Sequence, residues 1–143
     1  KSLSVLRIHL SFTISAETEI ESIIKLIMCI SRRKDMTREE FQEHWLNHHG
    51  PHFMQVAKSY RVKKYIQSHT LDTKLNSVVR DIRGMTREYD GIAEIWWESE
   101  EDYLAGLGSP QMRERGAEFL AAEADFVDPD NSTAFFSVEH ELI

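Results

Sequence analysis

The chain has 143 residues and a formal net charge of −7, which suits one domain with its own hydrophobic core. This acidic balance argues against a nucleic-acid partner, because binding a phosphate backbone requires clustered Lys and Arg. No apolar run approaches the roughly 20 residues of a membrane span, so we expect no membrane partner either. A single cysteine, Cys29, cannot form an internal disulfide, which favours a reducing, cytoplasmic location.

The first residues stand apart from the rest of the chain. Apolar and polar side chains alternate over residues 5–14, the period of a half-buried strand, and an acidic run follows at Glu17, Glu19 and Glu21. The segment lacks the features of a secretory signal. We interpret residues 1–22 as an N-terminal extension and residues 23–143 as the folded domain.

A strand and a helix open this domain. Residues 23–31 form a short, nearly continuous apolar run, as in a strand covered on both faces. Thr37 and Glu40 spell a capping box, which predicts a helix start near residue 37. Phe41, Trp45 and His49 then follow at i, i+4 and i+8 on one helix face, and Gly50-Pro51 is expected to interrupt the helix.

Two further strands are indicated after this helix. Residues 62–71 alternate in polarity, without showing which face is buried, and residues 72–90 read as a loop or cover with one short helix. Residues 89–99 give a third strand, with Ile92, Glu94 and Trp96 on one face and the residues between them on the other.

The last elements complete a recognisable order. Ser99 followed by three acidic residues predicts a helix start, and Pro110 suits the first turn of a second helical segment. Residues 133–143 read as the final strand. The order βαββαβ predicts an α+β, ferredoxin-like fold with a four-stranded antiparallel sheet. One sheet face would remain uncovered, so we expect a homodimer, a dimeric α+β barrel, that buries residues such as Ile95, Trp97 and Phe136.

Four segments of the sequence resemble the EthD family of dimeric α+β barrel proteins. They are "EFQEHWLNHHGPH", "KKYIQSH", "YDGIAEIWWES" and "VEHELI", which together extend through the domain from about residue 24. Relatives of this family include a methylmuconolactone isomerase, proteins of aromatic polyketide pathways and haem-binding enzymes. In the isomerase, a histidine at the end of the first helix and a tyrosine on the second strand lie in the pocket. The resemblance places His49 and Tyr65 there, with His48 as the alternative to His49.

The residue types suggest how such a site would work. A histidine titrates near neutral pH and can act as general base, while Tyr65 can donate a hydrogen bond to a developing oxyanion. Glu94 is a candidate second proton carrier if it points inward, although it can equally face solvent or a partner. The remaining candidates are substrate contacts: Phe41, Trp45, His52 and Trp96.

Cofactor chemistry has weaker support in the sequence. His44 and His48 have the i, i+4 spacing of a two-histidine metal clamp, but the HEXXH order of a metalloprotease is missing. Haem rests on distant analogy alone. We therefore expect no cofactor and no metal, and a lyase or isomerase that dehydrates, cyclises or isomerises a small aromatic, polyketide-like or lactone substrate. The alternatives are an oxidoreductase, cofactor-free or haem-dependent, and a non-enzymatic binding protein.

Overall fold

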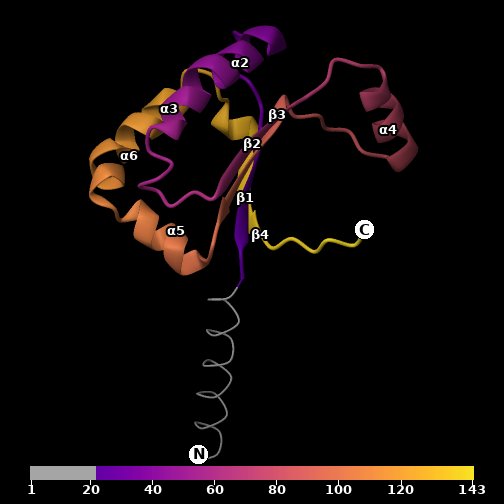
Figure 1. Ribbon diagram of the computed structural model, residues 1–143. Helices are drawn as coiled ribbons and strands as arrows, with labels where there is room; N and C mark the ends of the chain where they lie inside the picture. Colours follow the sequence, from indigo (N-terminus) through magenta and orange to yellow (C-terminus); the bar gives the residue numbers. More distant parts are fainter. Residues whose placement is uncertain (1–21) are drawn as a thin grey trace, which may run out of the picture.

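The computed structural model describes residues 22–143, which form one antiparallel sheet with most of the helices on one side of it (Figure 1). The strand predicted within residues 5–14 lies outside the described residues. The strands are β1 (Ile24–Ile30), β2 (Lys64–His69), β3 (Gly91–Trp97) and β4 (Thr133–Ser137). Their order in the sheet is β2-β3-β1-β4, with every neighbouring pair antiparallel. The ferredoxin-like topology expected from the sequence is confirmed.

The helices of the domain form a layer against the sheet. They are α2 (Arg38–His44), η1 (Trp45–His49), α3 (Gly50–Met54), α5 (Glu100–Leu107) and α6 (Pro110–Glu123), with a short 3-10 turn, η2 (Pro129–Asn131), before β4. Figure 1 shows a further helix, α4 (Leu75–Arg83), on the opposite side of the sheet. It lies within the stretch 72–90, where one short helix was expected.

The predicted helix starts are present with their capping hydrogen bonds. The Thr37 hydroxyl accepts from the backbone N–H of Glu40 at 3.1 Å, and the Glu40 carboxylate accepts from the backbone N–H of Thr37 at 2.9 Å. Ser99 caps α5 in the same way by accepting from the backbone N–H of Asp102. Pro110 occupies the first turn of α6, where a missing N–H costs nothing.

The expected interruption at Gly50-Pro51 is wrong. The helix continues through this pair because residues 45–49 wind as a π-helix, in which the backbone N–H of Gly50 donates to the carbonyl of Trp45, five residues earlier. Pro51 then falls in the first turn of α3, where a proline needs no backbone donor. The wider turn also rotates the side chains beyond it, as π turns at functional sites often do.

Pairing between strands fixes which side chains face the helices. Opposite residues of an antiparallel pair point to the same side, and the pairs Leu26–Ile95 and Ile24–Trp97 lie on the helix side within the core. Trp97 is fully buried, and its indole N–H donates to the carbonyl of Tyr60 at 2.7 Å.

The expected dimer face therefore requires correction. Ile95 and Trp97 are buried inside the protomer, and Phe136 contacts Trp97 and Tyr103 on the helix side. The other face of the sheet is the open one. It carries Lys25, Ile27, Cys29, Lys64, Ile66, Ile92, Glu94, Trp96 and Phe135.

Candidate functional site

A small cavity lies between the helix layer and the sheet. Its volume is about 40 Å³. Most of its lining is apolar: Met28, Ile30, Trp45, Phe53, Ala93, Ile95, Phe126 and Val127. Three ionisable residues complete the lining, namely His49 from the π-helix, Tyr65 from β2 and Glu123 from the end of α6.

His49 is the histidine that reaches this cavity. Its ring packs against Phe126, with the ring centroids 4.9 Å apart. Burial, reinforced by the neighbouring His52 and His44, lowers the pKa of His49 to about 4. The imidazole is therefore neutral at pH 7, the state in which it can accept a proton. Within residues 22–143 its ring nitrogens have no hydrogen-bond partner, so both remain available to a ligand.

His48 points elsewhere. It is exposed, and its Nε2 lies 3.5 Å from the carboxylate of Glu43 at the surface. Its ring also stacks on that of His44, at 5.3 Å between centroids. His48 does not line the cavity, which removes it from the candidate set.

Tyr65 faces His49 from the sheet side of the cavity. The side chain of Gln67 donates to the phenolic oxygen of Tyr65 at 2.9 Å and to the carbonyl of Trp45 at 3.0 Å. Burial raises the pKa of Tyr65, although hydrogen bonding from Gln67 and Trp45 partly opposes the rise. Because the oxygen already accepts hydrogen bonds, its own proton is the group left to offer a ligand.

Glu123 is the ionisable residue that sequence reasoning missed. Burial raises the pKa of its carboxyl group. A signal was present in the sequence: Glu123 follows the buried Phe119 by four residues, so the two lie on the same face of α6.

Glu94 and Trp96 lie on the wrong side of the sheet for this cavity. Both are on the open face, where the ammonium of Lys25 lies 3.6 Å from Glu94 and over the ring of Trp96. The indole N–H of Trp96 also donates to Glu139. These contacts match the alternative reading of Glu94 as a solvent-facing group, and neither residue can touch a ligand in the cavity.

Of the other three predicted substrate contacts, one lines the cavity and two do not. Trp45 lines the cavity, and its ring stacks on that of His69 at 4.8 Å between centroids. Phe41 is fully buried beneath Trp45 and supports it without reaching the cavity. His52 lies outside, where its Nε2 is 3.0 Å from Glu118 and its ring packs on Phe119.

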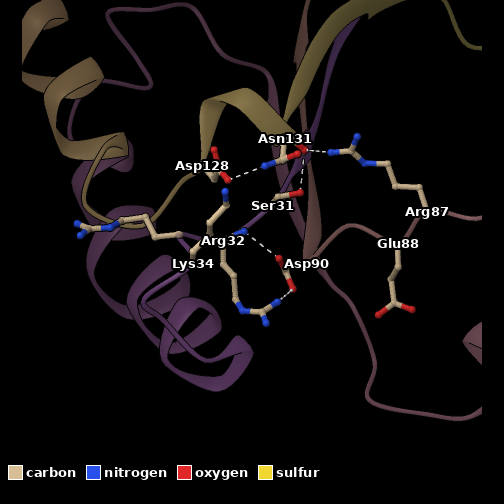
Figure 2. Close-up of a pocket in the computed structure, with 9 residues that line it drawn as sticks. Ser31, Arg32, Lys34, Arg87, Glu88, Asp90, Asp128 and Asn131 are labelled. Atoms are coloured by element: carbon tan, nitrogen blue, oxygen red, sulfur yellow. Dashed lines mark hydrogen bonds and ion pairs between the residues drawn. The ribbon is translucent and has the colours of Figure 1, made fainter.

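A larger hollow of about 530 Å³ lies at the end of the sheet and is open to solvent. Figure 2 shows hydrogen bonds among the polar groups that line it: the guanidinium of Arg32 donates to Asp90 at 2.7 Å, and the side-chain amide of Asn131 donates to Asp128 at 2.7 Å. Burial alone would raise the pKa of Asp90, but hydrogen bonds from Arg32 and Arg38 hold it below its usual value. We interpret this hollow as a structural ion-pair network.

The residues present do not form an evident metal or haem site. No group of three or more His, Cys, Asp or Glu side chains in the described part of the chain is arranged to hold a metal ion. A porphyrin is many times larger than the cavity and does not fit it.

No helix among residues 22–143 is both long and apolar enough to cross a membrane.

The fold and the cavity together define an α+β protein of the ferredoxin-like class with a small buried site between sheet and helices. Comparison with protein families shows that the chain belongs to the EthD domain family, which it matches over residues 33–130. No curated protein matches the chain.

Solved structures share this fold at low sequence identity. An EthD family protein from Bacillus halodurans has 13% identity and a TM-score of 0.54, over 82% of this chain and 99% of that one. A hydroxynitrile lyase from Passiflora edulis has 15% identity and a TM-score of 0.53, over 86% and 98%. SnoaB, a cofactor-independent oxygenase from Streptomyces nogalater, has 8% identity and a TM-score of 0.51, over 85% and 97%.

Proposed function

We propose that the protein is a cofactor-independent lyase or isomerase in which His49 removes a proton from a small, neutral substrate and Tyr65 stabilises the resulting oxyanion. One observation carries the proposal: His49 and Tyr65 enter the same apolar cavity from opposite layers of the fold. A neutral imidazole with free nitrogens can accept a proton, and a phenol with its oxygen already accepting hydrogen bonds can donate one. An apolar enclosure strengthens both interactions, because water does not compete for them.

The cavity volume limits the substrate. About 40 Å³ is roughly the space of one water molecule, whereas a cavity known to bind benzene has a volume of about 150 Å³. A lactone or aromatic substrate therefore requires the lining to open. Met28, on the sheet, and Phe53, on a helix, both line the cavity with long side chains. Met28 can change rotamer at low cost, so it is the side chain best able to let the lining open. Small carbonyl compounds, which occupy less space than the expected aromatic, polyketide-like or lactone substrates, demand less rearrangement.

Enzymes with this fold are known: a hydroxynitrile lyase and a cofactor-independent oxygenase share it. The fold alone does not select a reaction. The proposal rests instead on the residues of the cavity, which supply a base and a hydrogen-bond donor.

Proton transfer can be tested without knowing the natural substrate. Small ketones and lactones incubated with the protein in D2O should exchange the hydrogen α to the carbonyl, as followed by NMR. His49→Ala should slow the exchange roughly a hundredfold or more, the usual contribution of a positioned base. His48→Ala is the matched control, because it removes an adjacent but exposed imidazole. Exchange that survives His49→Ala would contradict the role of His49 as the base. If the wild-type protein binds these compounds without exchanging their hydrogens, the alternative function, a non-enzymatic binding protein, replaces the proposed one.

A further inference from the structure

The cavity contains an acidic group for which the proposed proton abstraction has no use. Glu123, at the last turn of α6, faces the same enclosed space as His49 and Tyr65. Its carboxyl group has no hydrogen-bond or ion-pair partner among the described residues. The His49 imidazole is likewise without a hydrogen-bond partner among the described residues, so one cavity is lined by an acid and a base that are both available to a ligand.

Surface carboxylates on the same helix behave differently. Glu118 forms contacts with His52 and Arg115, and these hydrogen bonds lower its pKa. Glu123 instead has no cation beside it, and burial raises its pKa. Burial thus shifts the pKa of Glu123 upward and that of His49 downward, so the cavity pairs a carboxyl group, which can deliver a proton, with an imidazole, which can remove one.

We propose that Glu123 is the general acid of this site and that the substrate is a β-hydroxy carbonyl compound, which the protein dehydrates. This inference rests on the proposed function of His49. His49 takes the proton from the carbon α to the carbonyl, and the C–H electron pair forms an enolate whose oxyanion accepts a hydrogen bond from Tyr65. As the carbonyl re-forms, this electron pair returns to make the new double bond between the α and β carbons. The β carbon–oxygen bond breaks with its electron pair on oxygen, and Glu123 donates its proton to that oxygen, which leaves as water. Tyr65 donates a hydrogen bond to the carbonyl oxygen throughout.

The charges balance at the end of this step. His49 is left as an imidazolium and Glu123 as a carboxylate, so one proton returning from the first to the second restores the site. No oxidant, reductant or further reactant is required. The geometry also explains why the base and acid come from different elements: η1 and α6 present them to one cavity, whose remaining wall is the sheet.

The experiment uses two probes that differ only in the leaving group, 4-hydroxybutan-2-one and 4-acetoxybutan-2-one. NMR in D2O reports both α-hydrogen exchange and formation of the shared unsaturated ketone. Glu123→Gln keeps the size of the side chain but cannot donate an acidic proton. We expect it to slow elimination from the hydroxy probe roughly a hundredfold or more, with α-exchange retained. Elimination from the acetoxy probe should be nearly unchanged, since acetate leaves without protonation.

Control variants distinguish a failure of the Glu123 proposal from a failure of the proposed function of His49. Glu114→Gln neutralises an exposed carboxylate on the same helix and should leave both rates unchanged. Glu123→Asp, which keeps the acid, should retain part of the activity, and thermal melting checks that each variant folds. Equal slowing of both probes by Glu123→Gln would overturn the acid role, as would undiminished elimination from the hydroxy probe. Absence of α-exchange in the wild-type protein would instead overturn the proposed function and this inference with it.

Discussion

His48 and His49 are adjacent in sequence but face opposite environments. The His49 imidazole lies in the cavity against Phe126, whereas His48 Nε2 lies at the surface, 3.5 Å from Glu43. Adjacent side chains point in different directions in the π turn of residues 45–49 as in any helix, so only one of the two can face the side that Phe41 and Trp45 bury. The row that these two residues begin, visible in the sequence, correctly predicts His49 as the residue that faces inward.

Replacing Tyr65 with Phe should isolate the contribution of one hydrogen bond. The ring keeps its packing against Phe53, at 4.8 Å between centroids, so substrate affinity should change little. Turnover should fall roughly tenfold to a hundredfold, because the oxyanion forms only during the reaction. Steady-state kinetics on an active ketone provide the measurement. A rise in KM with unchanged kcat would assign Tyr65 to substrate binding instead.

The pH dependence of activity should reflect the lowered pKa of His49. The sequence alone suggests an acid limb near pH 6.5, the usual value for imidazole, but burial lowers the pKa to about 4. The base is deprotonated above that value, so the rate of α-hydrogen exchange, which needs only the base, should rise with pH through about 4 and remain flat across pH 6 to 7. Residual activity of His49→Ala should lack this limb. A limb near pH 6.5 in the wild-type protein would show that the imidazole is well solvated.

The same shift predicts how stability depends on pH. Between pH 6.5 and 4 the unfolded chain protonates His49 while the folded chain does not, so stability falls as pH decreases through this range. The loss should be about 2 kcal/mol after allowance for the partial exposure of the imidazole. Urea unfolding at pH 7 and pH 4 measures it, and His49→Gln should show a correspondingly smaller loss. Identical losses in both proteins would refute the burial of a neutral imidazole.

Several features of the fold could be read from the sequence because local chemistry determines them. The capping box at Thr37 and the Ser99 cap depend on side chains within three residues of a helix start, so their spacing is sufficient evidence. The order of strands and helices follows from such local signals. Residues from distant elements meet only after folding, which is why the cavity itself was harder to predict.

Three features of the structure differ from the sequence prediction because they depend on contacts that form only in the folded chain. Both faces of β3 carry a tryptophan and an isoleucine, so periodicity cannot tell which face the helices cover. The choice depends on tertiary contacts, such as the hydrogen bond from Trp97 to the Tyr60 carbonyl. Glu123 was overlooked because a glutamate near a helix end is usually solvated. Pro51 reads as a helix stop, and only the π turn before it allows the helix to continue.

Two glycines allow a matched test of packing. A Cβ on Gly106 would clash with the carbonyl oxygen of Tyr60, because α5 passes close to that backbone, whereas a Cβ on Gly116 would meet nothing within 4 Å. Gly106→Ala should therefore destabilise the fold by roughly 1–3 kcal/mol, the usual cost of overpacking. Gly116→Ala should stabilise it by about 0.5–1 kcal/mol, since alanine is the better helix former. Thermal unfolding of both variants provides the measurement, and a stable Gly106→Ala protein would contradict the close approach.

The open face of the sheet supports the expected homodimer, with different residues from those first predicted. Phe135 is 49% exposed on this face. On the same side of the sheet, α4 exposes apolar side chains, including Leu75, which is 68% exposed, and Ile82, which is 75% exposed (Figure 1). A second copy that covers the sheet could bury both surfaces, and apolar area of this kind is costly to leave in water.

A charge on this face should therefore prevent association. Phe135→Asp would place an unpaired carboxylate in the interface, at a cost of several kcal/mol, so sedimentation should show a dimer for the wild-type protein and a monomer for the variant. Ile82→Asp should weaken the dimer if α4 takes part in it. Leu120→Asp is the control, because Leu120 is 71% exposed on α6, in the helix layer away from this face. A monomeric wild-type protein at micromolar concentration would refute the dimer, and dissociation by Leu120→Asp would place the interface on the helix layer instead.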